Sequence, residues 1–433
     1  VRILAPQPNM IEILNKIFLR SKNLGNLNAE FQELRNKTGI ELIFQAVESY
    51  SDESEIRYVG GCVRKILRSE KVDDIDLATN LNPEQIIQVC KKKNIKFYET
   101  GLEHGTITVI INDYKFEITS LRKDLKTDGR HADVIFTNDW KEDASRRDFS
   151  INSIYSDLEG NIFDPFNGKQ DLENGKISFI GDAEKRIKED YLRILRYIRF
   201  FLNYSKHEHD REITKVIKKN LDGVSKISSE RLIDEFKKLF NSDGFLNLNN
   251  DKFSSEIINL IFPQFKNIHL LRDLNKYARD NIKKLDFIFF ISLMIADGTD
   301  NADYFIYKFN ISKKDQKRLK IIDDFYKGKI SPKSFSEKNL NKIFYYKGKQ
   351  SLIDILSFKI FLSKKIDKKL LKLIEKFENK NLPTMPFGAK FIMEKYQIQE
   401  GKSLGNKIKN IEEEWVNNDF NLSEKQIDKI INR

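Results

Sequence analysis

The spacing of hydrophobic residues divides the chain into two parts of different structural class. Between residues 55 and 120, short runs of β-branched and aromatic residues alternate with amphipathic segments. Strands are predicted at residues 96–99, 106–111 and 114–119. From about residue 182 onward, apolar positions recur at helical spacing almost without interruption. The pattern therefore predicts a small α/β unit followed by an all-α region.

An N-terminal extension and a helix at residues 40–50 are predicted before the first strand, and a further helix is predicted from residue 83. Residues 1–33 are interpreted as an N-terminal extension, with an amphipathic helix near residues 11–18 and a link rich in Gly and Asn after it. One helix is predicted for residues 40–50. Another is predicted to begin with Asn82 as its N-cap and Pro83 as its first helical residue.

The longest apolar run and the two cysteines limit the classes of protein to which the chain can belong. Residues 287–296 form an apolar run that contains one Ser and is too short to span a bilayer. This run predicts a buried core helix and no membrane partner. Cys62 and Cys90 are the only cysteines and form no CxxC motif, so we expect neither a disulfide framework nor a zinc site. The cytoplasm is the predicted location.

A glycine pair and an aspartate pair lie in residues 58–79, YVGGCVRKILRSEKVDDIDLAT. Gly60 and Gly61 carry no Cβ atom, so their backbone amides can approach a phosphate closely. Asp74 and Asp76 share one face if they lie in a strand, and Mg²⁺ between them would relieve their repulsion. The stretch favours a metal-dependent enzyme that handles a nucleoside triphosphate. A solvated turn after a glycine-bearing loop is the alternative.

A third carboxylate for a two-metal site is available in the predicted strand 114–119. Glu117 lies between two apolar neighbours, so in a sheet it could face Asp74 and Asp76. An ordinary solvent-facing glutamate is the alternative.

Two polar segments follow this strand. Residues 121–131 contain Gly and charges of both signs, which predicts a mobile loop beside the site. In residues 146–152, RRDFSIN, two guanidiniums and a carboxamide surround an acid. Arg can bind phosphate in a bidentate manner, whereas Asp and Asn can contact a ribose hydroxyl. A surface salt-bridge cluster is the alternative.

One continuous helix is predicted for residues 182–204, with a single apolar stripe at helical spacing. Asp190 and Arg193 are neighbours on the flank of this stripe, with Glu189 and Arg196 farther round. An acid and a guanidinium held together present acceptors and donors that could read the edge of a base. The alternative is an ion pair that only supports the helix, by roughly 0.2–0.5 kcal/mol.

The stretch HEHD, residues 207–210, has the letters of a metal-binding signature found in HD phosphohydrolases. Such a site needs further ligands, but the only later histidine is His269, which has no Asp in a matching pattern. We therefore interpret HEHD as a polar loop and expect no HD phosphohydrolase metal site.

Taken in order, these segments resemble the class II tRNA nucleotidyltransferase and poly(A) polymerase family. The matching stretches between Gly60 and Phe240 are GGCVRKIL…DDIDLAT, HGTITV, FEITSLRKDLKTDGRHADVIF, RRDFSINSIY, DPFNGKQDL, RIKEDYLRILRYIRF and SSERLIDEFKKLF. The C-terminal PFGAKFIMEKY…EGKSLGNKIKNIEEEW is similar to the tail of the bacterial CCA-adding members. Only residues 1–33 fall outside the resemblance.

The resemblance implies an α/β head with a polymerase-β-like nucleotidyltransferase sheet, followed by all-α neck, body and tail domains. The implied domains are a catalytic head at residues 34–163, a neck with a nucleotide-template helix at 164–245, a body at 246–330 and a tRNA-binding tail at 331–433.

The resemblance also implies roles for individual residues. Catalysis and the binding of Mg²⁺ would fall to Asp74, Asp76 and Glu117. Nucleotide binding would involve Gly60, Gly61, Arg64, Arg147, Asp148, Asn152, Glu189, Asp190, Arg193 and Arg196, of which Asp190 and Arg193 would pair with the incoming C or A. The flexible loop would contain Asp128, Gly129 and Arg130. The chain departs from the family pattern at Lys65, where Asp is usual, and at Ser150 and Ser153, in place of Thr and Ala.

The implied function is that of a CCA tRNA nucleotidyltransferase, which adds C, C and A to the 3′ end of tRNA from CTP and ATP without a nucleic-acid template. The presence of Asp128–Arg130 argues against an enzyme that adds only CC. Residues 97–109 lack the basic stretch of the poly(A) polymerase branch. A poly(A) polymerase on the same scaffold is the alternative, and a catalytically inactive RNA-binding protein is a further one.

The expected partners are the acceptor arm of tRNA, CTP and ATP. The formal net charge of +11 favours a polyanionic partner. A composition that is rich in Lys for other reasons would give the same charge, so the charge supports nucleic acid only in combination with the motifs.

Overall fold

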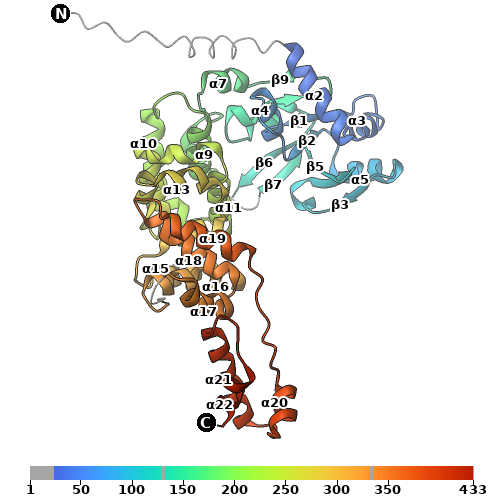
Figure 1. The fold of residues 1–433 in the computed structure, drawn as a ribbon. Coiled ribbons are helices and arrows are strands. Elements are labelled where there is room, and N and C mark those ends of the chain that lie inside the picture. The colour runs from blue at the N-terminus through green and yellow to red at the C-terminus, as the bar shows by residue number, and fades with distance from the viewer. Residues whose placement is uncertain (1–23, 128–131, 331–334, 433) are drawn as a thin grey trace, which may run out of the picture. The chain divides into compact units, whose positions relative to one another are not determined.

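The computed structural model describes residues 24–127, 132–330 and 335–432 (Figure 1). The helix predicted near residues 11–18 and the loop residues Asp128, Gly129 and Arg130 lie outside these ranges. The chain divides after Ser228 into two compact units. As predicted, the first contains a mixed sheet with helices and the second is built from helices. Among the described residues, no helix is both long and apolar enough to cross a membrane.

The first unit is built on a seven-stranded sheet with the order β3-β4-β5-β2-β1-β8-β9, beside a separate ribbon of β6 and β7. The strands are β1 Ile56–Val59, β2 Ile75–Thr79, β3 Lys96–Tyr98, β4 Thr106–Ile111, β5 Tyr114–Ser120, β6 Arg122–Thr127, β7 Ala132–Phe136, β8 Tyr155–Ser156 and β9 Ile162–Phe163. The three strands predicted within residues 96–119 are therefore confirmed.

Helices and short 3₁₀ turns complete this unit. The helices are α2 Leu24–Thr38, α3 Glu41–Glu48, α4 Gly61–Leu67, α5 Pro83–Lys92, α6 Trp140–Ser145, α7 Gly168–Asn174, α8 Ala183–Glu189, α9 Leu192–Tyr204 and α10 Arg211–Lys219. The 3₁₀ turns are η1 Leu102–His104, η2 Ser150–Asn152 and η3 Leu221–Lys226. The side chain of Asn82 accepts a hydrogen bond from the Gln85 amide in a capping box before Pro83, so the predicted start of α5 is confirmed.

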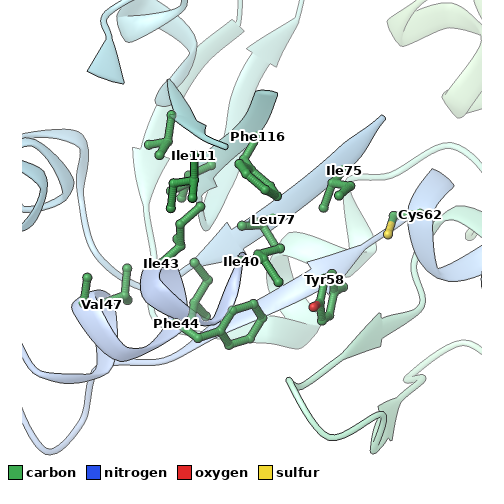
Figure 2. Close-up of a cluster of buried hydrophobic side chains, with 14 of the residues drawn as sticks. Ile40, Ile43, Phe44, Val47, Tyr58, Cys62, Ile75, Leu77, Ile111 and Phe116 are labelled. Atoms are coloured by element: carbon green, nitrogen blue, oxygen red, sulfur yellow. The ribbon is translucent and has the colours of Figure 1, made fainter. Parts of the chain in front are cut away.

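The core of the first unit lies between helices α2 to α5 and one face of the sheet. Phe44 of α3, Tyr58 of β1, and Ile75 and Leu77 of β2 are buried in one apolar cluster (Figure 2). Ile75 and Leu77 alternate with Asp76 along β2, so Asp76 emerges on the opposite face. Burying one face of the central strand in this core thus fixes where the carboxylate points.

Two expectations about local structure in this unit are wrong. The Gly- and Asn-rich link is helical from Leu24 onward, and Phe31 of α2 is fully buried in the core, which explains why this segment orders. The segment 121–131 was expected to be a loop, but residues 122–127 form β6, which pairs with β7. The polar composition of residues 122–127 does not reveal that this segment pairs with residues 132–136.

The helix predicted for residues 182–204 is broken into α8 and α9. Asp190 adopts an extended backbone with φ −154° and ψ 105°, and its Oδ1 accepts a hydrogen bond from the Leu192 amide at 3.1 Å. Short polar side chains compete with helical hydrogen bonds in this way. The ring of Tyr191 lies so close to Gly223 that a Cβ atom there would be 2.0 Å from it. The apolar stripe continues across the break, which is why the spacing did not reveal it.

Within residues 229–330 and 335–432, the second unit begins with α11 Ser229–Phe240 and continues with eleven further helices. They are α12 Lys252–Ile261, α13 Lys276–Asn281, α14 Phe287–Ile295, α15 Asn301–Lys308, α16 Lys313–Tyr326, α17 Glu337–Lys347, α18 Lys349–Leu362, α19 Lys368–Asn379, α20 Ala389–Tyr396, α21 Lys402–Asn417 and α22 Glu424–Ile431. Its 3₁₀ turns are η4 Asp243–Asn249, η5 Ile268–Arg272 and η6 Ile282–Lys284. As predicted, the apolar run 287–296 forms a buried helix, α14.

Candidate active site

The carboxylates predicted to bind metal lie at the centre of the sheet. Strand β2 runs parallel to β5, and the register places Asp76 directly beside Glu117. Residues in register on neighbouring parallel strands point to the same face of a sheet. Asp74 precedes β2 by one residue and is exposed.

The electrostatic environment of Asp76 reflects this crowding. Burial raises the pKa of Asp76, and the negative charges of Glu117 and Asp74 raise it further, against the lowering effect of Arg147 and Arg64. The net pKa is above its ordinary value, because like charges and desolvation both disfavour the ionised carboxylate. A cation at this position would remove the source of that penalty.

Glu117 has a different partner in this structure. Its Oε1 accepts a hydrogen bond from Nζ of Lys115 at 2.6 Å, and this contact raises the pKa of Lys115. In the part of the chain that the structure describes, no three His, Cys, Asp or Glu side chains converge as a metal-binding group. Of the three carboxylates, Glu117 is the one that the structure pairs with a lysine.

Arginine side chains lie close to these carboxylates. Two of them, Arg146 and Arg147, are held in place by the buried carboxylate of Asp143. Asp143 of α6 is 1% exposed and its carboxylate accepts hydrogen bonds from Arg146 at 2.8 Å, Arg147 at 3.1 Å and the Tyr155 hydroxyl at 2.7 Å. Burial alone would raise the pKa of Asp143, but Arg147 and Arg146 hold it well below its usual range. The acid therefore stays ionised and fixes both guanidiniums.

A second buried carboxylate, that of Asp148, links the segment of residues 146–152 to helix α9. Asp148 accepts hydrogen bonds from Arg196 Nε at 2.6 Å and from Asn152 Nδ2 at 2.8 Å. The Oδ1 atom of Asn152 in turn accepts a hydrogen bond from Arg64. Burial opposes ionisation of Asp148, but Arg196, Asn152 and Arg193 lower its pKa to about 2. Glycine-bearing helix α4 and helix α9 are thus joined through one chain of polar contacts.

The orientation of Arg193 is set by Glu189, which corrects the expected pairing. Its Nη1 donates to Glu189 Oε2 at 2.6 Å and to the Arg186 carbonyl at 2.9 Å. The expected helical pair of Asp190 and Arg193 does not form, because Asp190 lies in the break before α9. Arg186 also donates to Glu189, at 2.8 Å. Two arginines therefore share one glutamate, which holds the Arg193 guanidinium in place.

Many of these groups line one pocket of about 380 Å³. Its lining residues are Gly60, Gly61, Arg64, Asp76, Arg146, Arg147, Asp148, Asn152, Asp190, Arg193, Arg196, Arg199 and Phe200. Six arginines against three aspartates give the pocket an excess of positive charge, which suits a triphosphate. The predicted residues Asp74, Glu117 and Glu189 lie outside this lining, the last of them behind Arg193.

Gly60 occupies a conformation that few other residues adopt. It has a φ of 66° as the residue before α4, and a Cβ atom there would be 3.4 Å from the Asn152 carbonyl. Glycine is therefore required by the backbone turn rather than by lack of space. The turn brings Gly60 and Gly61 into the pocket lining.

Sequence reasoning missed Asp143, Tyr155, Arg199 and Phe200 at this site. Asp143 lies three and four residues before Arg146 and Arg147 on a helical segment, and that spacing was a usable signal. No comparable signal identifies Tyr155, which reaches Asp143 only through the sheet.

The HEHD segment forms the connection between α9 and α10, as predicted. The ring of His209 stacks on Phe201 with centroids 3.5 Å apart, and Nδ1 lies 3.1 Å from the Tyr197 hydroxyl. Asp210 caps α10 by accepting a hydrogen bond from the Glu212 amide at 2.7 Å. These contacts are structural.

Two protein-family models match the chain. The model described as "Poly A polymerase head domain" matches residues 56–178. The model described as "Probable RNA and SrmB- binding site of polymerase A" matches residues 209–268. The first match covers both aspartates, Glu117 and the arginine-bearing loop.

Curated relatives match over most of the chain. The mitochondrial CCA tRNA nucleotidyltransferase 1 of Homo sapiens is 31% identical over 405 residues, which cover 87% of this chain and 86% of that protein. The CCA-adding enzyme of Staphylococcus haemolyticus is 30% identical over 326 residues, or 74% of this chain and 76% of that protein. The CCA-adding enzyme of Lactobacillus johnsonii is 40% identical over 187 residues, or 43% of this chain and 46% of that protein.

Solved structures share the fold. The Bacillus stearothermophilus CCA-adding enzyme in complex with CTP has a TM-score of 0.72 at 21% identity and covers 93% of this chain and 97% of that one. A tRNA nucleotidyltransferase complexed with a primer tRNA and an incoming ATP analog has a TM-score of 0.60 at 21% identity, with coverage of 79% and 100%. With the sequence matches, these findings show that the chain belongs to the class II tRNA nucleotidyltransferase and poly(A) polymerase family, and within it to the CCA-adding enzymes.

Proposed function

We propose that this chain adds C, C and A to the 3′ end of tRNA from CTP and ATP, without a nucleic-acid template. The observation that carries the proposal is the one pocket in which a strand carboxylate, Asp76, lies close to arginine side chains, with Arg193 and Arg196 of α9 beside it. One end of this pocket suits the reacting phosphates and the other presents side chains that can hydrogen-bond a base.

The residues of the pocket divide between phosphate and sugar. Gly60, Gly61 and Arg64 bind the triphosphate, and Arg147, whose Nη1 would lie 3.5 Å from a Cβ atom at Gly60, lies by the phosphates beside them. Asp148 and Asn152 contact the ribose. Lys65 is not among the residues that line the pocket, and its Nζ lies 3.4 Å from Asp73 Oδ2. The tRNA 3′-hydroxyl attacks the α-phosphate, and pyrophosphate leaves. Fixed guanidiniums supply positioning and charge stabilisation without reorganisation during the reaction.

Asp74, Asp76 and Glu117 would hold Mg²⁺. Hard carboxylate oxygens are the donors that this cation prefers, and the raised pKa of Asp76 reflects burial and uncompensated negative charge at that position. The bound ions would lower the charge on the attacking and leaving oxygens. The chain's own contribution is to fix the carboxylates on adjacent strands in register.

Replacing Asp76 with Asn is expected to stabilise the cation-free protein at pH 7. The substitution removes a negative charge that burial, Glu117 and Asp74 all disfavour. Adding Mg²⁺ should raise the melting temperature of the wild type, by the linkage of binding to folding, and should have little effect on Asp76→Asn. Differential scanning fluorimetry with and without Mg²⁺ measures both effects. Equal stabilisation of the two proteins by Mg²⁺ would contradict the metal assignment.

Asp190 and Arg193 select the base. Glu189 holds Arg193, and Asp190 lies in the pocket lining at the break before α9. The guanidinium donates to base acceptors and the carboxylate or the adjacent backbone accepts from base donors.

Replacing Arg193 with Ala is expected to lower the preference for CTP at the first addition by about 10- to 100-fold, because a hydrogen bond to a charged group is lost. The measurement is the ratio of kcat/KM for CTP and ATP on a primer that ends at the discriminator base. Lys188→Ala is the control, because Lys188 pairs with Glu184 on the exposed side of α8. Loss of stability with unchanged nucleotide preference would instead support an ion pair that only stabilises the helix.

The proposed partner is tRNA, whose acceptor arm lies along the lysine-rich neck, body and tail helices. Phosphate contacts of this kind make binding weaken steeply with salt. The proposed division of the chain is an extension at 1–33, a head at 34–163, a neck at 164–245, a body at 246–330 and a tail at 331–433. Its first boundary falls within α2, and its neck extends across the boundary between the two compact units. We place the enzyme in the cytoplasm, a proposal supported by the two free, buried cysteines.

The experiment for this function uses purified protein, Mg²⁺ and tRNA that ends at the discriminator base. With CTP and ATP together, the product is expected to grow by the three nucleotides C, C and A. Long tails from ATP alone would show a poly(A) polymerase, which the relatives do not favour. Absence of any product, with tRNA still bound, would show an inactive RNA-binding protein.

A further inference from the structure

Two aromatic rings continue the pocket face of α9 beyond its arginines. Phe200 and Tyr204 follow Arg193 and Arg196 at helical spacing, so the four side chains share one face of the helix. The two rings stack with centroids 6.2 Å apart and an interplanar angle of 22°. Phe200 is 2% exposed, although it also lines the pocket.

Arg64 of α4 and Arg68, the residue directly after this helix, lie over these rings. The Arg64 guanidinium carbon is 4.9 Å from the Phe200 centroid and 5.4 Å from that of Tyr204, and Arg68 is 5.4 Å from Tyr204. Arg64 and Arg68 are one helical turn apart, as are the two rings. Matched pairs of cations and rings thus join α4 to α9. We call Arg64, Arg68, Phe200 and Tyr204 the α4–α9 clamp.

Glu70 closes the outer end of the clamp. Its Oε1 accepts a hydrogen bond from Arg68 Nε at 2.9 Å, and its Oε2 accepts one from the Tyr204 hydroxyl at 3.4 Å. At the inner end, Arg196 and Arg199 also approach the Phe200 ring, at 5.6 and 4.2 Å. Three guanidiniums therefore surround one ring, where their attraction to its electron-rich face is strengthened by burial.

The clamp joins the two sides of the pocket that have to act together. Helix α4 begins directly after Gly60 and carries Arg64, on the triphosphate side. Helix α9 carries Arg193, on the base side. An enzyme that reads a base with side chains has to hold those side chains at a fixed distance from the reacting phosphate.

We propose that Phe200 is a positioning residue which, through the cation–π contacts of the α4–α9 clamp, sets the separation of the triphosphate-binding helix from the base-reading helix. This inference rests on the proposed function, since it assigns the two sides of the pocket to phosphate and base. The ring itself does not take part in bond formation. Its effect is on which nucleotide is accepted and how efficiently it reacts.

The test replaces Phe200 with phenylalanines that carry one, two or three ring fluorines. Fluorine withdraws electron density from the ring face and leaves the shape of the side chain nearly unchanged, so packing is preserved while the cation–π attraction fades. We expect kcat/KM for CTP on a primer ending at the discriminator base to fall stepwise, by roughly 5- to 30-fold over the series. The preference for CTP over ATP at this step is expected to fall in parallel.

The matched control is the same fluorinated series at Phe201. This ring is the next residue of α9, but it stacks on His209 and lines a different cavity, of about 530 Å³. We expect kcat/KM and nucleotide preference to stay constant across that series, with melting temperatures similar in both. Parallel losses at Phe200 and Phe201 would overturn the proposal, because they would indicate a general effect of ring packing.

Two outcomes separate this inference from the proposed function. If the protein completes CCA and kcat/KM stays constant across the fluorinated series at Phe200, the proposed role of Phe200 is wrong and the proposed function stands. If the unmodified protein adds no nucleotide, the proposed function is wrong. The affinity for CTP, measured by calorimetry across the Phe200 series, then tests the proposed role of Phe200. Affinity that falls with each fluorine supports it, and constant affinity overturns it.

Discussion

Replacing Asp76 with Ala is expected to lower the rate of nucleotide transfer by at least about 10³-fold, while tRNA affinity changes little. Asp76 is the carboxylate that lines the pocket, and it is beside Glu117 on the neighbouring strand. Its loss removes negative charge from the position where a cation would neutralise the attacking and leaving oxygens. Binding of tRNA depends mostly on phosphate contacts elsewhere. Single-turnover extension of primer tRNA and a filter-binding assay measure the two quantities.

Asp73→Ala is the matched control for this variant. Asp73 is exposed, lies three residues before Asp76 and pairs with Lys65 and Lys71 on the surface. Exposed ion pairs contribute little, so transfer should stay near the wild-type rate. Activity that survives in Asp76→Ala, or an equal loss in both variants, would show that Asp76 has been assigned the wrong role.

Replacing Asp148 with Ala is expected to destabilise the first unit by about 3–5 kcal/mol. The substitution leaves Arg196 without its buried carboxylate and removes the acceptor of the Asn152 side chain. In a Trp415→Phe background, Trp140 is the remaining tryptophan and reports on the first unit. Urea unfolding followed by Trp140 fluorescence then measures the free energy of unfolding of that unit.

The acid dependence of stability gives a second measure of Asp148. Its pKa in the folded protein is about 2, below the ordinary value of about 4. The stabilisation is therefore fully present above pH 4 and is lost as the pH falls toward 2. Asp148→Ala should lose less stability over this range than the wild type does. Asp73→Ala, at a side chain of the first unit that is 57% exposed in an ion pair with Lys65, should change the free energy of unfolding by less than about 1 kcal/mol. A similar small change for Asp148→Ala would contradict the buried network.

The strands and the start of α5 could be predicted from the sequence, because each depends on local pattern. Period-two alternation indicates that Glu117 could face Asp76 if the two strands are neighbours in a sheet, and β2 and β5 are paired in a register that puts the two residues side by side. The order of the motifs along the chain indicated the family, which the spacing of hydrophobic residues alone could not do. The conformation of residues 121–127 could not be read in this way, because β6 depends on its pairing with β7.

Other features depend on contacts between distant residues. The break at Asp190 replaces helical hydrogen bonds with an Asx contact, and the apolar stripe gives no sign of it. Glu189 rather than Asp190 therefore became the partner of Arg193. The ring contacts of Arg64 join segments more than a hundred residues apart, and no pattern within either helix indicates them.

The central claim is that side chains of one pocket choose the base at every addition without a nucleic-acid template. The most direct test is single-turnover extension of three primers, which end at the discriminator base, at the first C and at the second C, each offered CTP or ATP. We expect CTP to be used on the first two primers and ATP on the third. Use of ATP on the first primer, or of the same nucleotide on all three, would contradict the account.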